Sequence, residues 1–336
     1  MNTSEKSSFS NFFSHIYIEQ EAYDYPLTGK ILSFFPHSHT IEIKHYKDIF
    51  DRMRQDCSMQ KKSPALILAV KHNDMIYKGA PVCQSFGNEY FYYTSNILNC
   101  IYNCDYCYLG GMYPSAHIVI FVNTDDFFAE VEKMLSEHPV YLCISYDTDL
   151  MAFENMTGLV SSWIDFASLH NDLKLEIRTK SAFSDGFSHW TPSENIIFAW
   201  TLSPDEIIEE FEHRTPGLDS RIAAIKHALA AGFTLRLCFD PMIYVPGYQK
   251  IYSDMYRKVF SEIPSEKLLD VSLGLFRISS GYMNVMRKRY PNEITSYPFT
   301  GRCGICSYDE KRSREMLDFA RSELTGYIDP DKINEI

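Results

Sequence analysis

From about residue 89 the chain alternates short apolar runs with longer stretches whose apolar residues recur at helical spacing. The short runs are rich in Val, Ile, Phe and Tyr, as is typical of buried strands. They predict strands over Glu89–Ser95, His117–Asn123, Val140–Tyr146, Leu173–Lys180, Ile196–Leu202, Thr234–Phe239 and Asp270–Phe276. The longer stretches predict helices over Asp126–Glu137, Thr157–His170, Leu218–Ala231 and Tyr248–Glu262.

Strand, helix and strand at this spacing predict βαβ units and a parallel sheet. Gly232 follows a predicted helix at the position where a glycine commonly ends one. With about six units, a full or partial (β/α) barrel is favoured over an open doubly wound sheet. In a barrel, the reacting groups belong at the carboxyl ends of the strands.

The segments on either side of this alternation have a different pattern. Before it, we expect a small mixed α/β segment with a strand over Thr40–His45, a helix over Lys47–Asp56 and a strand over Ala65–Val70. After Gly281 the rhythm ends, and a last helix is expected near Asp309–Leu324. The chain is therefore divided into an N-terminal segment, 1–84, a barrel, 85–280, and a C-terminal extension, 281–336.

Composition narrows the function classes. The chain has 336 residues with 32 basic and 44 acidic side chains, a net charge of −12, so no broad basic surface points to nucleic acid, although a local basic groove is compatible with this balance. The N-terminus lacks the features of a signal peptide, and no apolar run approaches the ~20 residues of a membrane span. We expect a cytoplasmic protein without a membrane partner, in which the nine cysteines stay reduced and serve as metal ligands or reactive thiols.

The most specific motif is a run of three cysteines, Cys100, Cys104 and Cys107, directly after the first predicted barrel strand. Structural zinc sites usually take four protein ligands, and no fourth ligand lies close by in the sequence. An iron–sulfur cube bound by three thiolates leaves one iron open, and an open iron can chelate a ligand. The spacing therefore favours an iron–sulfur centre placed where a barrel has its active site.

The C-x3-C-x2-C run resembles the signature of radical S-adenosylmethionine enzymes. Further matches resemble one branch of that superfamily, the spore photoproduct lyases. These matches are Tyr25-Pro-Leu27, Cys104-Asp-Tyr-Cys-Tyr-Leu109, Ile120-Phe-Val-Asn123, Met156-Thr-Gly158, Arg178-Thr-Lys180, Phe211-Glu212, Leu218-Asp219, Arg221-Ile222 and Gly301-Arg302. The similarity runs from about residue 16 to about residue 310. It implies a partial (β/α)6 TIM-type barrel of the radical S-adenosylmethionine kind.

The resemblance also implies an activity. Spore photoproduct lyases repair the methylene-bridged thymine dimer that ultraviolet light forms in spore DNA. They use a [4Fe–4S] cluster and S-adenosylmethionine, whose reductive cleavage gives a 5′-deoxyadenosyl radical. The implied partners are damaged DNA, with the lesion flipped out of the duplex, and an external electron donor such as flavodoxin or ferredoxin. Family members resemble monomers.

Residue by residue, Cys100, Cys104 and Cys107 match the cluster ligands. Tyr106 and Tyr108 match tyrosines implied in radical transfer or in ordering the site, with simple packing beside the cluster as the alternative. The implied cofactor-binding residues are Lys180, near the S-adenosylmethionine carboxylate, with Thr201, Ser203 and Asp149. For each of them an ordinary structural role at a strand end remains open. Arg302 resembles an arginine that contacts the lesion.

The hydrogen donor departs from the family pattern. Counting back from the Thr157-Gly158 pair, the position of the usual donor cysteine holds Tyr146, and Cys143 lies three residues earlier. Cys83, 17 residues before the first cluster cysteine, is the other candidate. Cys83 and Cys143 both stay open as the donor, with Tyr146 as a relay, and a buried inert cysteine is the alternative for either.

A second departure is Cys303, because the resemblance implies a tyrosine at this position. With Cys306 it could form a redox pair or supply a thiol to the lesion pocket. Cys57 and Cys238 are interpreted as structural.

Three functions remain. The leading one is a spore photoproduct lyase, whose phosphate contacts would come from Arg287, Lys288, Arg289, Arg302 and the Lys61-Lys62 pair. The second is a lyase-like radical enzyme acting on another, nucleotide-type substrate. The third is a non-catalytic iron–sulfur or zinc module that binds DNA.

Overall fold

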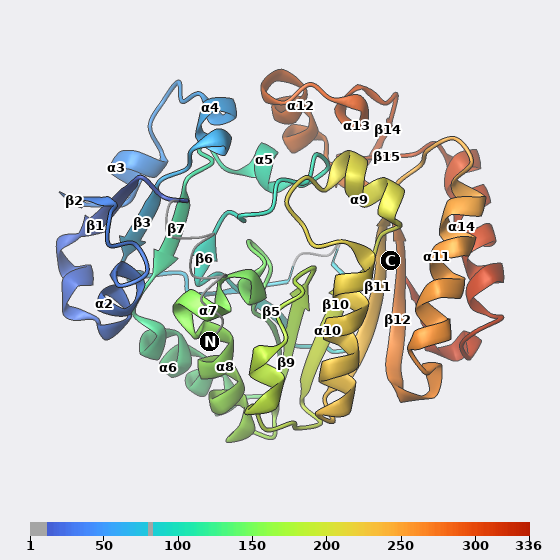
Figure 1. Ribbon diagram of the computed structural model, residues 1–336, viewed down its shortest axis with the longest axis horizontal. Helices are drawn as coiled ribbons and strands as arrows, with labels where there is room; N and C mark the ends of the chain where they lie inside the picture. Colours follow the sequence, from blue (N-terminus) through green and yellow to red (C-terminus); the bar gives the residue numbers. More distant parts are fainter. Residues whose placement is uncertain (1–11, 80–82) are drawn as a thin grey trace.

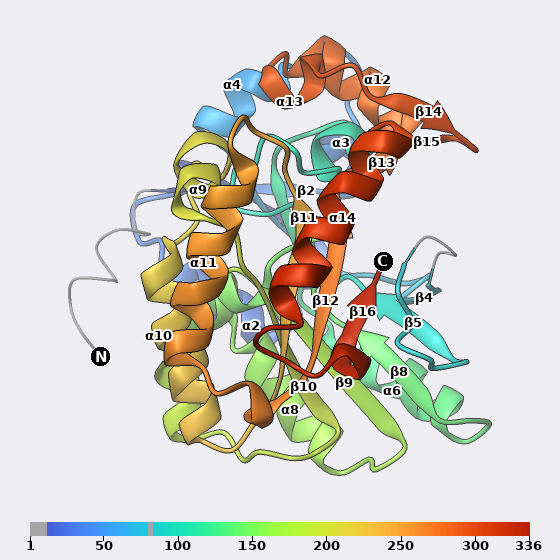
Figure 2. The same cartoon turned by 90° about the vertical axis from the view of Figure 1, so that its right-hand side faces the viewer.

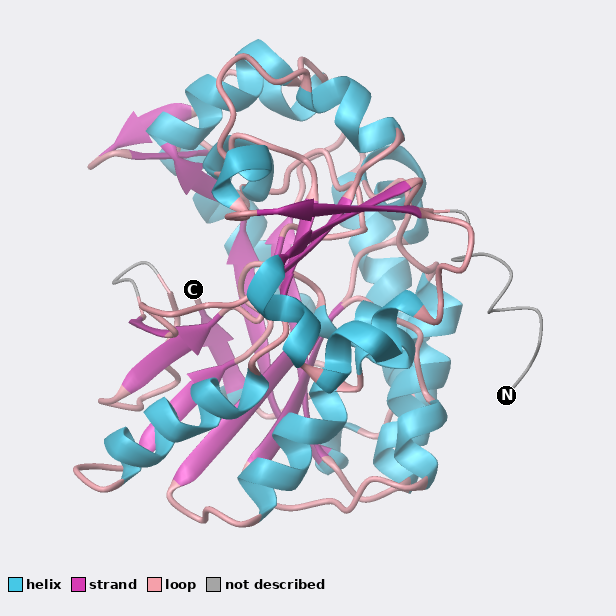
Figure 3. Cartoon of the chain, turned by 90° about the vertical axis from the view of Figure 1, so that its left-hand side faces the viewer, coloured by secondary structure: helices cyan, strands magenta, loops and turns pink. Residues whose placement is uncertain are grey.

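The computed structural model describes residues 12–79 and 83–336, and its strands form three sheets. The first sheet lies on the left in Figure 1 and faces the viewer in Figure 3. Its strands are parallel except for β6, which runs antiparallel to β7. In spatial order they are β2 (His39–Ile43), β1 (His15–Glu19), β3 (Leu66–Ala69), β7 (Ile118–Phe121) and β6 (Ile97–Leu98).

The second sheet is the predicted barrel, and it stays open. Six of its strands, β5 and β8 to β12, are parallel and lie next to one another in the order in which they occur in the sequence. The intervening strands β6 and β7 belong to the first sheet. One edge strand is β16, parallel to β12, and the other is β4, antiparallel to β5. In spatial order they are β16 (Ile333–Glu335), β12 (Leu268–Leu275), β11 (Thr234–Met242), β10 (Ile196–Thr201), β9 (Leu173–Thr179), β8 (Val140–Cys143), β5 (Phe91–Thr94) and β4 (Ile76–Lys78). The prediction of a partial barrel is confirmed.

Helices cover the outer face of this sheet (Figures 1 and 2). Figure 2 shows α11 and α14 side by side over β11 and β12. The covering helices are α6 (Thr124–Leu135), α8 (Leu159–Ser168), α10 (Leu218–Ala230), α11 (Tyr248–Glu262) and α14 (Glu310–Leu324). Their buried faces and the fully buried strands belong to one continuous apolar core. The near-continuous apolar runs in the sequence follow from this arrangement, because parallel strands are buried on both faces.

The predicted helix over Thr157–His170 is interrupted at Gly158. This residue has a φ of 72°, a left-handed conformation that glycine adopts without strain, and it separates α7 (Glu154–Thr157) from α8. Lys30 Nζ donates to the carbonyl oxygen of Thr157 at 2.9 Å. This bond gives a partner to a carbonyl group at the C-terminal end of α7, where carbonyl groups lack partners within the helix.

Two predictions from the pattern were wrong. The strand predicted over His117–Asn123 forms, as β7, but it pairs with β3 in the first sheet and is no part of the barrel. Periodicity identifies a strand without identifying its partner, which explains the error. The helix predicted over Lys47–Asp56 stops early: α3 covers only Lys47–Phe50, and α4 (Cys57–Lys62) begins after a separate cap, Asp56, whose side chain accepts from the Met59 N–H. The three-part division of the chain stays a prediction, and the first sheet takes β6 and β7 from beyond residue 84.

The segment after β12 forms a small third sheet and two helices at the top of Figure 1. The sheet has the antiparallel order β13 (Arg277–Ser279), β15 (Ile305–Ser307), β14 (Thr300–Arg302). Between β13 and β14 lie α12 (Ser280–Arg289) and α13 (Glu293–Ser296). None of the described helices is long and apolar enough to cross a membrane.

The remaining short elements are η1 (Gln20–Asp24), α2 (Pro26–Leu32), α5 (Leu109–Met112), η2 (Leu150–Phe153), η3 (Asp185–Ser188), α9 (Asp205–Phe211), η4 (Ser265–Lys267) and η5 (Pro330–Lys332).

His117 ties the starts of β3 and β7 together, and it gives the fold a dependence on pH. Its Nδ1 accepts from the Ala65 N–H at 2.9 Å, and burial lowers the pKa of His117 to about 4. A histidine that is neutral in the folded state contributes stability above its unfolded pKa, ~6.5, and this stability is lost as pH falls toward 4.

We therefore expect the free energy of unfolding to fall by up to about 3 kcal/mol between pH 6.5 and pH 4 because of this group. Urea unfolding at several pH values measures it. In His117→Asn, which keeps an acceptor without a titrating group, this pH-dependent component should disappear. An unchanged slope in the variant would contradict the assignment.

Candidate active site

A cavity of about 510 Å³ opens at the carboxyl ends of the barrel strands. Five neighbouring strands contribute to its lining at or near their ends, through Cys143 of β8, Thr179 of β9, Thr201 of β10, Asp240 of β11 and Leu275 of β12. This volume is within the range of small-molecule sites. The sequence predicts the reacting groups at this edge of the sheet, which is where the cavity opens.

The three motif cysteines lie in the loop between β6 and α5, and all three line the cavity. The loop is anchored at its start by Asn99, whose φ is 67° and whose Nδ2 donates to the carbonyl oxygens of Ser115 and His117 at 2.8 and 2.7 Å. Burial raises the pKa of the Cys104 thiol to about 12. In the part of the chain that the structure describes, no three His, Cys, Asp or Glu side chains converge on a position for a single metal ion.

Cys104 is also held from the other side of the loop. It forms an antiparallel bridge with Glu212, and the Asp105 N–H donates to the Phe211 carbonyl oxygen at 2.9 Å. Lys180 Nζ lies 3.9 Å from Cys104 Sγ. The cysteine loop is thus joined to the segment that follows α9 and to the end of β9.

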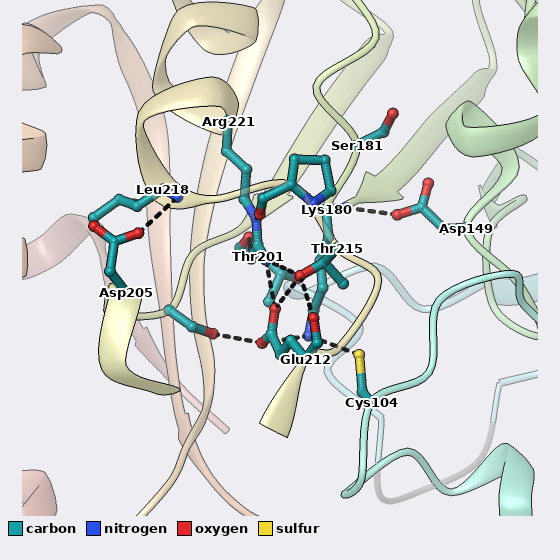
Figure 4. A network of polar contacts seen from close by, with 12 residues as sticks. Cys104, Asp149, Lys180, Ser181, Thr201, Asp205, Glu212, Thr215, Leu218 and Arg221 are labelled. Carbon is teal, nitrogen blue, oxygen red and sulfur yellow. Dashed lines mark hydrogen bonds and ion pairs between the residues drawn. The ribbon is translucent and has the colours of Figure 1, made fainter. Parts of the chain in front are cut away.

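The Glu212 carboxylate is the centre of a buried polar network (Figure 4). Oε1 accepts from Lys180 Nζ and from Ser203 Oγ, both at 2.8 Å, and from the Tyr106 hydroxyl. Oε2 accepts from Arg221 Nη2 at 2.5 Å. Although burial raises it, the neighbouring charges of Lys180 and Arg221 bring the pKa of Glu212 well below its usual range. The group is therefore a carboxylate that fixes two cations and a phenol.

The predicted cofactor-binding residues divide into two groups. Lys180, Thr201 and Asp149 line the cavity, whereas Ser203 lies behind it, bonded to Glu212. Asp149 accepts from Thr179 Oγ1 at 2.7 Å and from the Lys180 N–H at 2.6 Å, so its carboxylate already supports the end of β9. Burial raises the pKa of Asp149, against these hydrogen bonds.

The two motif tyrosines point to different partners. The Tyr106 hydroxyl bonds to Glu212, whereas the Tyr108 hydroxyl donates to the Tyr146 carbonyl oxygen at 2.6 Å. Both line the cavity. Their hydroxyl groups therefore connect the cysteine loop to two different walls of the cavity.

Both candidate donor thiols line the same cavity, in different surroundings. Cys83 is half-buried, and its Sγ is hydrogen-bonded to the Tyr146 hydroxyl. The ring of Tyr146 stacks on that of Tyr93, with the two ring centroids 4.4 Å apart. Cys143 is buried, with its Sγ 4.0 Å from Glu176 Oε1, and burial raises the pKa of its thiol to about 12.

Arg302 and Cys303 lie apart from the groups described so far. They are exposed at the β14–β15 hairpin, and neither lines the cavity, although Ile305 of the same hairpin does. Cys303 and Gly304 have φ values of 50° and 79°, as a tight hairpin turn requires. Cys303 and Cys306 are both free thiols.

Sequence reasoning gave no role to several charged residues of the site. Glu212, Arg221 and Arg178 entered only as parts of matching motifs, and Asp240 and Arg277 did not enter at all. The one available signal was the presence of charged residues in otherwise apolar segments, since such residues are rarely buried without partners. Some of the partners lie far away along the chain, as Lys180 does from Glu212 and Asp240 from Arg277, and cannot be read from local spacing.

Comparison with known proteins gives consistent results. The family model for spore photoproduct lyase matches residues 12–302. The chain is 24% identical to the spore photoproduct lyase of Bacillus subtilis (strain 168), with 94% of each chain covered. It is 21% identical to that of Clostridium acetobutylicum, covering 97% of this chain and 99% of the relative. A solved structure of spore photoproduct lyase complexed with dinucleoside spore photoproduct is similar, with a TM-score of 0.80, 20% identity, and 97% and 98% of the two chains covered.

A double mutant of spore photoproduct lyase with bound AdoMet and dinucleoside spore photoproduct gives the same TM-score, 0.80, at 20% identity, again covering 97% and 98% of the two chains. At these identities, the solved structures show the fold that the chain shares with them.

The buried network yields a prediction about stability. Glu212→Ala leaves Lys180 and Arg221 without their common carboxylate, and we expect the free energy of unfolding to fall by about 3–5 kcal/mol. Chemical denaturation of the purified chain measures this. As a control, Glu130→Ala removes an exposed carboxylate paired with Lys133, and it should change stability by less than about 1 kcal/mol. Equal effects of the two substitutions would contradict a special role for Glu212.

Proposed function

This chain belongs to the spore photoproduct lyase family, and we propose that it repairs the methylene-bridged thymine photoproduct in DNA by radical reversal. The proposed cofactors are a [4Fe–4S] cluster and S-adenosylmethionine, with an external electron donor. The observation that carries the proposal is the convergence of Cys100, Cys104, Cys107 and Lys180 with a hydrogen-bonded thiol on one cavity.

The donor set fits the cluster. Three cysteines from a single loop face one cavity. Three thiolates can each bind one iron of a four-iron cube and leave the fourth iron open for a ligand. When bound, the cluster with S-adenosylmethionine supplies a carbon-centred radical that removes one hydrogen atom from the lesion.

Lys180 is placed to position an anionic group beside the cysteine loop. Its ammonium group is held by Glu212 and Tyr106, and the adjoining peptide N–H is held by Asp149. A cation fixed in this way can bind a carboxylate without first having to order a flexible side chain. We assign Lys180 to the S-adenosylmethionine carboxylate, with Thr201 nearby on the same wall.

Cys83 is the proposed hydrogen donor. After the methylene bridge has broken, the product radical needs one hydrogen atom, and the S–H bond of Cys83 gives it, which leaves the unpaired electron on Sγ. The hydrogen bond between Cys83 and the Tyr146 hydroxyl allows the phenol to return a hydrogen atom to the sulfur, which moves the unpaired electron to the phenol oxygen. One electron from the external donor and one proton from solvent then restore the tyrosine. Among the described residues Cys143 has no hydroxyl partner, and its Sγ lies 4.0 Å from a carboxylate oxygen of Glu176.

A second function is favoured by one observation. Cys303 sits exposed on the hairpin that, from the resemblance, was expected to contact the lesion, and neither it nor Arg302 lines the cavity. A lyase-like radical enzyme with another nucleotide-type substrate would accommodate this difference. Such an enzyme would form 5′-deoxyadenosine without repairing the thymine photoproduct.

The assay that tests the proposal uses anaerobically iron-reconstituted protein with S-adenosylmethionine, a reductant and the dinucleotide spore photoproduct, followed by chromatography. We expect repaired thymidine dinucleotide. Cys83→Ala should lower the yield of repaired product at least about tenfold while 5′-deoxyadenosine still forms, because only the quenching step is lost.

Cys143→Ala is the matched control, since it removes the other thiol of the same cavity, and it should change the yield less than about twofold. The reverse pattern would move the donor to Cys143. Formation of 5′-deoxyadenosine with an intact lesion in the unmodified protein would contradict the substrate and favour the second function.

A further inference from the structure

Two arginine side chains share one carboxylate inside the cavity. Arg277 Nη1 donates to Asp240 Oδ1 at 2.9 Å, and Arg178 Nη1 lies 3.8 Å from Asp240 Oδ2. The three residues come from β13, β11 and β9, so only the folded sheet brings them together. All three line the cavity that the cluster cysteines and Cys83 also line.

The backbone leaves room for this arrangement at Gly274 of β12. A Cβ atom there would lie 2.7 Å from Asp240 Oδ1 and 2.9 Å from Arg277 Nη1. Because contacts this short force one partner to move, a side chain at this position would push the Asp240 carboxylate or the Arg277 guanidinium group away. Glycine at position 274 thus leaves the space that the ion pair occupies.

Most hydrogen-bond donors of the two arginines are still available. Arg178 donates from Nε to Glu176 at 3.3 Å, and Arg277 Nη1 donates also to the Leu275 carbonyl oxygen at 3.1 Å. Among the described residues these bonds and the one to Asp240 are the hydrogen bonds that the two guanidinium groups make. Their side chains are 29% and 27% exposed, although each guanidinium group carries five N–H donors.

The neighbouring carboxylates cannot take up these donors. Glu176 accepts from Arg236 Nη1 at 2.5 Å, and Arg236 also binds Asp270. Arg178 therefore shares the Glu176 carboxylate with Arg236 and the Asp240 carboxylate with Arg277. An anion that enters the cavity therefore meets the guanidinium groups of Arg178 and Arg277, which are held in place but still have free N–H donors.

Forked guanidinium donors match the oxygens of a phosphate group, and paired arginines are common where phosphate is recognised. In the proposed substrate, two thymidines are joined by a phosphodiester, which is the only group of the lesion with a full negative charge. We propose that Arg178 and Arg277 form a subsite for this phosphodiester, with Asp240 holding the two guanidinium groups. The inference rests on the proposed function and specifies how its substrate is recognised.

Two of the basic residues that the sequence suggested for phosphate have other partners in the structure. Arg289 Nη1 donates to the Tyr113 carbonyl oxygen at 2.6 Å, and Lys61 Nζ lies 3.9 Å from the centre of the Tyr290 ring. Neither lines this cavity. The arginine pair is therefore better placed to hold a phosphate beside the reacting groups.

The test compares two forms of one lesion that differ only in the phosphate: the dinucleotide spore photoproduct and the dinucleoside spore photoproduct. Equilibrium binding to the full-length, iron-reconstituted protein is measured by calorimetry, without reductant, so that no turnover occurs. We expect the dinucleotide to bind at least about tenfold more tightly. In Arg277→Gln this preference should shrink to less than about threefold while affinity for the dinucleoside stays unchanged.

Arg277→Lys keeps the charge without the fork and should retain part of the preference. Arg257→Gln makes the same chemical change on the exposed face of α11, and it should leave the preference intact. Thermal unfolding shows whether each variant is folded. If Arg277→Gln does not fold, the lesion preference is compared in Arg277→Lys and Arg178→Gln instead.

Equal affinity of the unmodified protein for the two lesions would overturn the subsite and leave the proposed function standing. A preference that survives in both Arg277→Gln and Arg178→Gln would also overturn it, because the phosphate would then be bound elsewhere. Weaker binding of S-adenosylmethionine in Arg277→Gln, with the lesion preference intact, would assign the pair to the cofactor carboxylate instead. Failure of the unmodified protein to bind either lesion would overturn the proposed function itself, and the subsite with it.

Discussion

The site depends on one buried carboxylate. Glu212 is almost completely enclosed, and it bonds at once to Lys180, Arg221 and Tyr106. These partners come from the end of β9, from α10 and from the cysteine loop, so a single side chain joins three parts of the chain that are far apart in sequence. A buried charge is tolerated only when it is paired and hydrogen-bonded, and this requirement fixes all of its partners together. Through Tyr106 and the bridge to Cys104, Glu212 helps to hold the cysteine loop, whose start is anchored by Asn99.

The same reasoning applies across the cavity. Arg178, Asp240 and Arg277 form a second charged group, joined to Arg236 and Asp270 through Glu176. The two groups differ in what they leave unused. Around Glu212 the bonds mainly hold Arg221, Tyr106 and Lys180 in place, and of the two cations only Lys180 lines the cavity, whereas Arg178 and Arg277 both keep unused donors there. One wall is therefore suited to holding the cysteine loop, and the other is suited to binding an anionic substrate.

The strands and most helices could be predicted because they follow from local periodicity. The strand ranges from Val140 onward are close to those of the structure, and α11 coincides with the predicted helix over Tyr248–Glu262. The strand at His117–Asn123 was predicted in the wrong sheet, because an apolar run of this length is equally suited to any parallel neighbour. Its parallel partner is β3, to which it is also joined by the hydrogen bond between His117 and the Ala65 N–H. Short elements with little apolar content, such as β13–β15, gave no periodic signal.

The sequence by itself determined what depends on neighbours along the chain: the spacing of Cys100, Cys104 and Cys107, the order of the βαβ units, and the family. Only the tertiary structure decided which distant side chains meet. It placed Cys83 against Tyr146, 63 residues away, and Arg277 against Asp240, 37 residues away. It also left Arg302 and Cys303 on an exposed hairpin. The physical reason is that ion pairs and hydrogen bonds act over a few ångströms in space, whereas a sequence pattern records only separation along the chain.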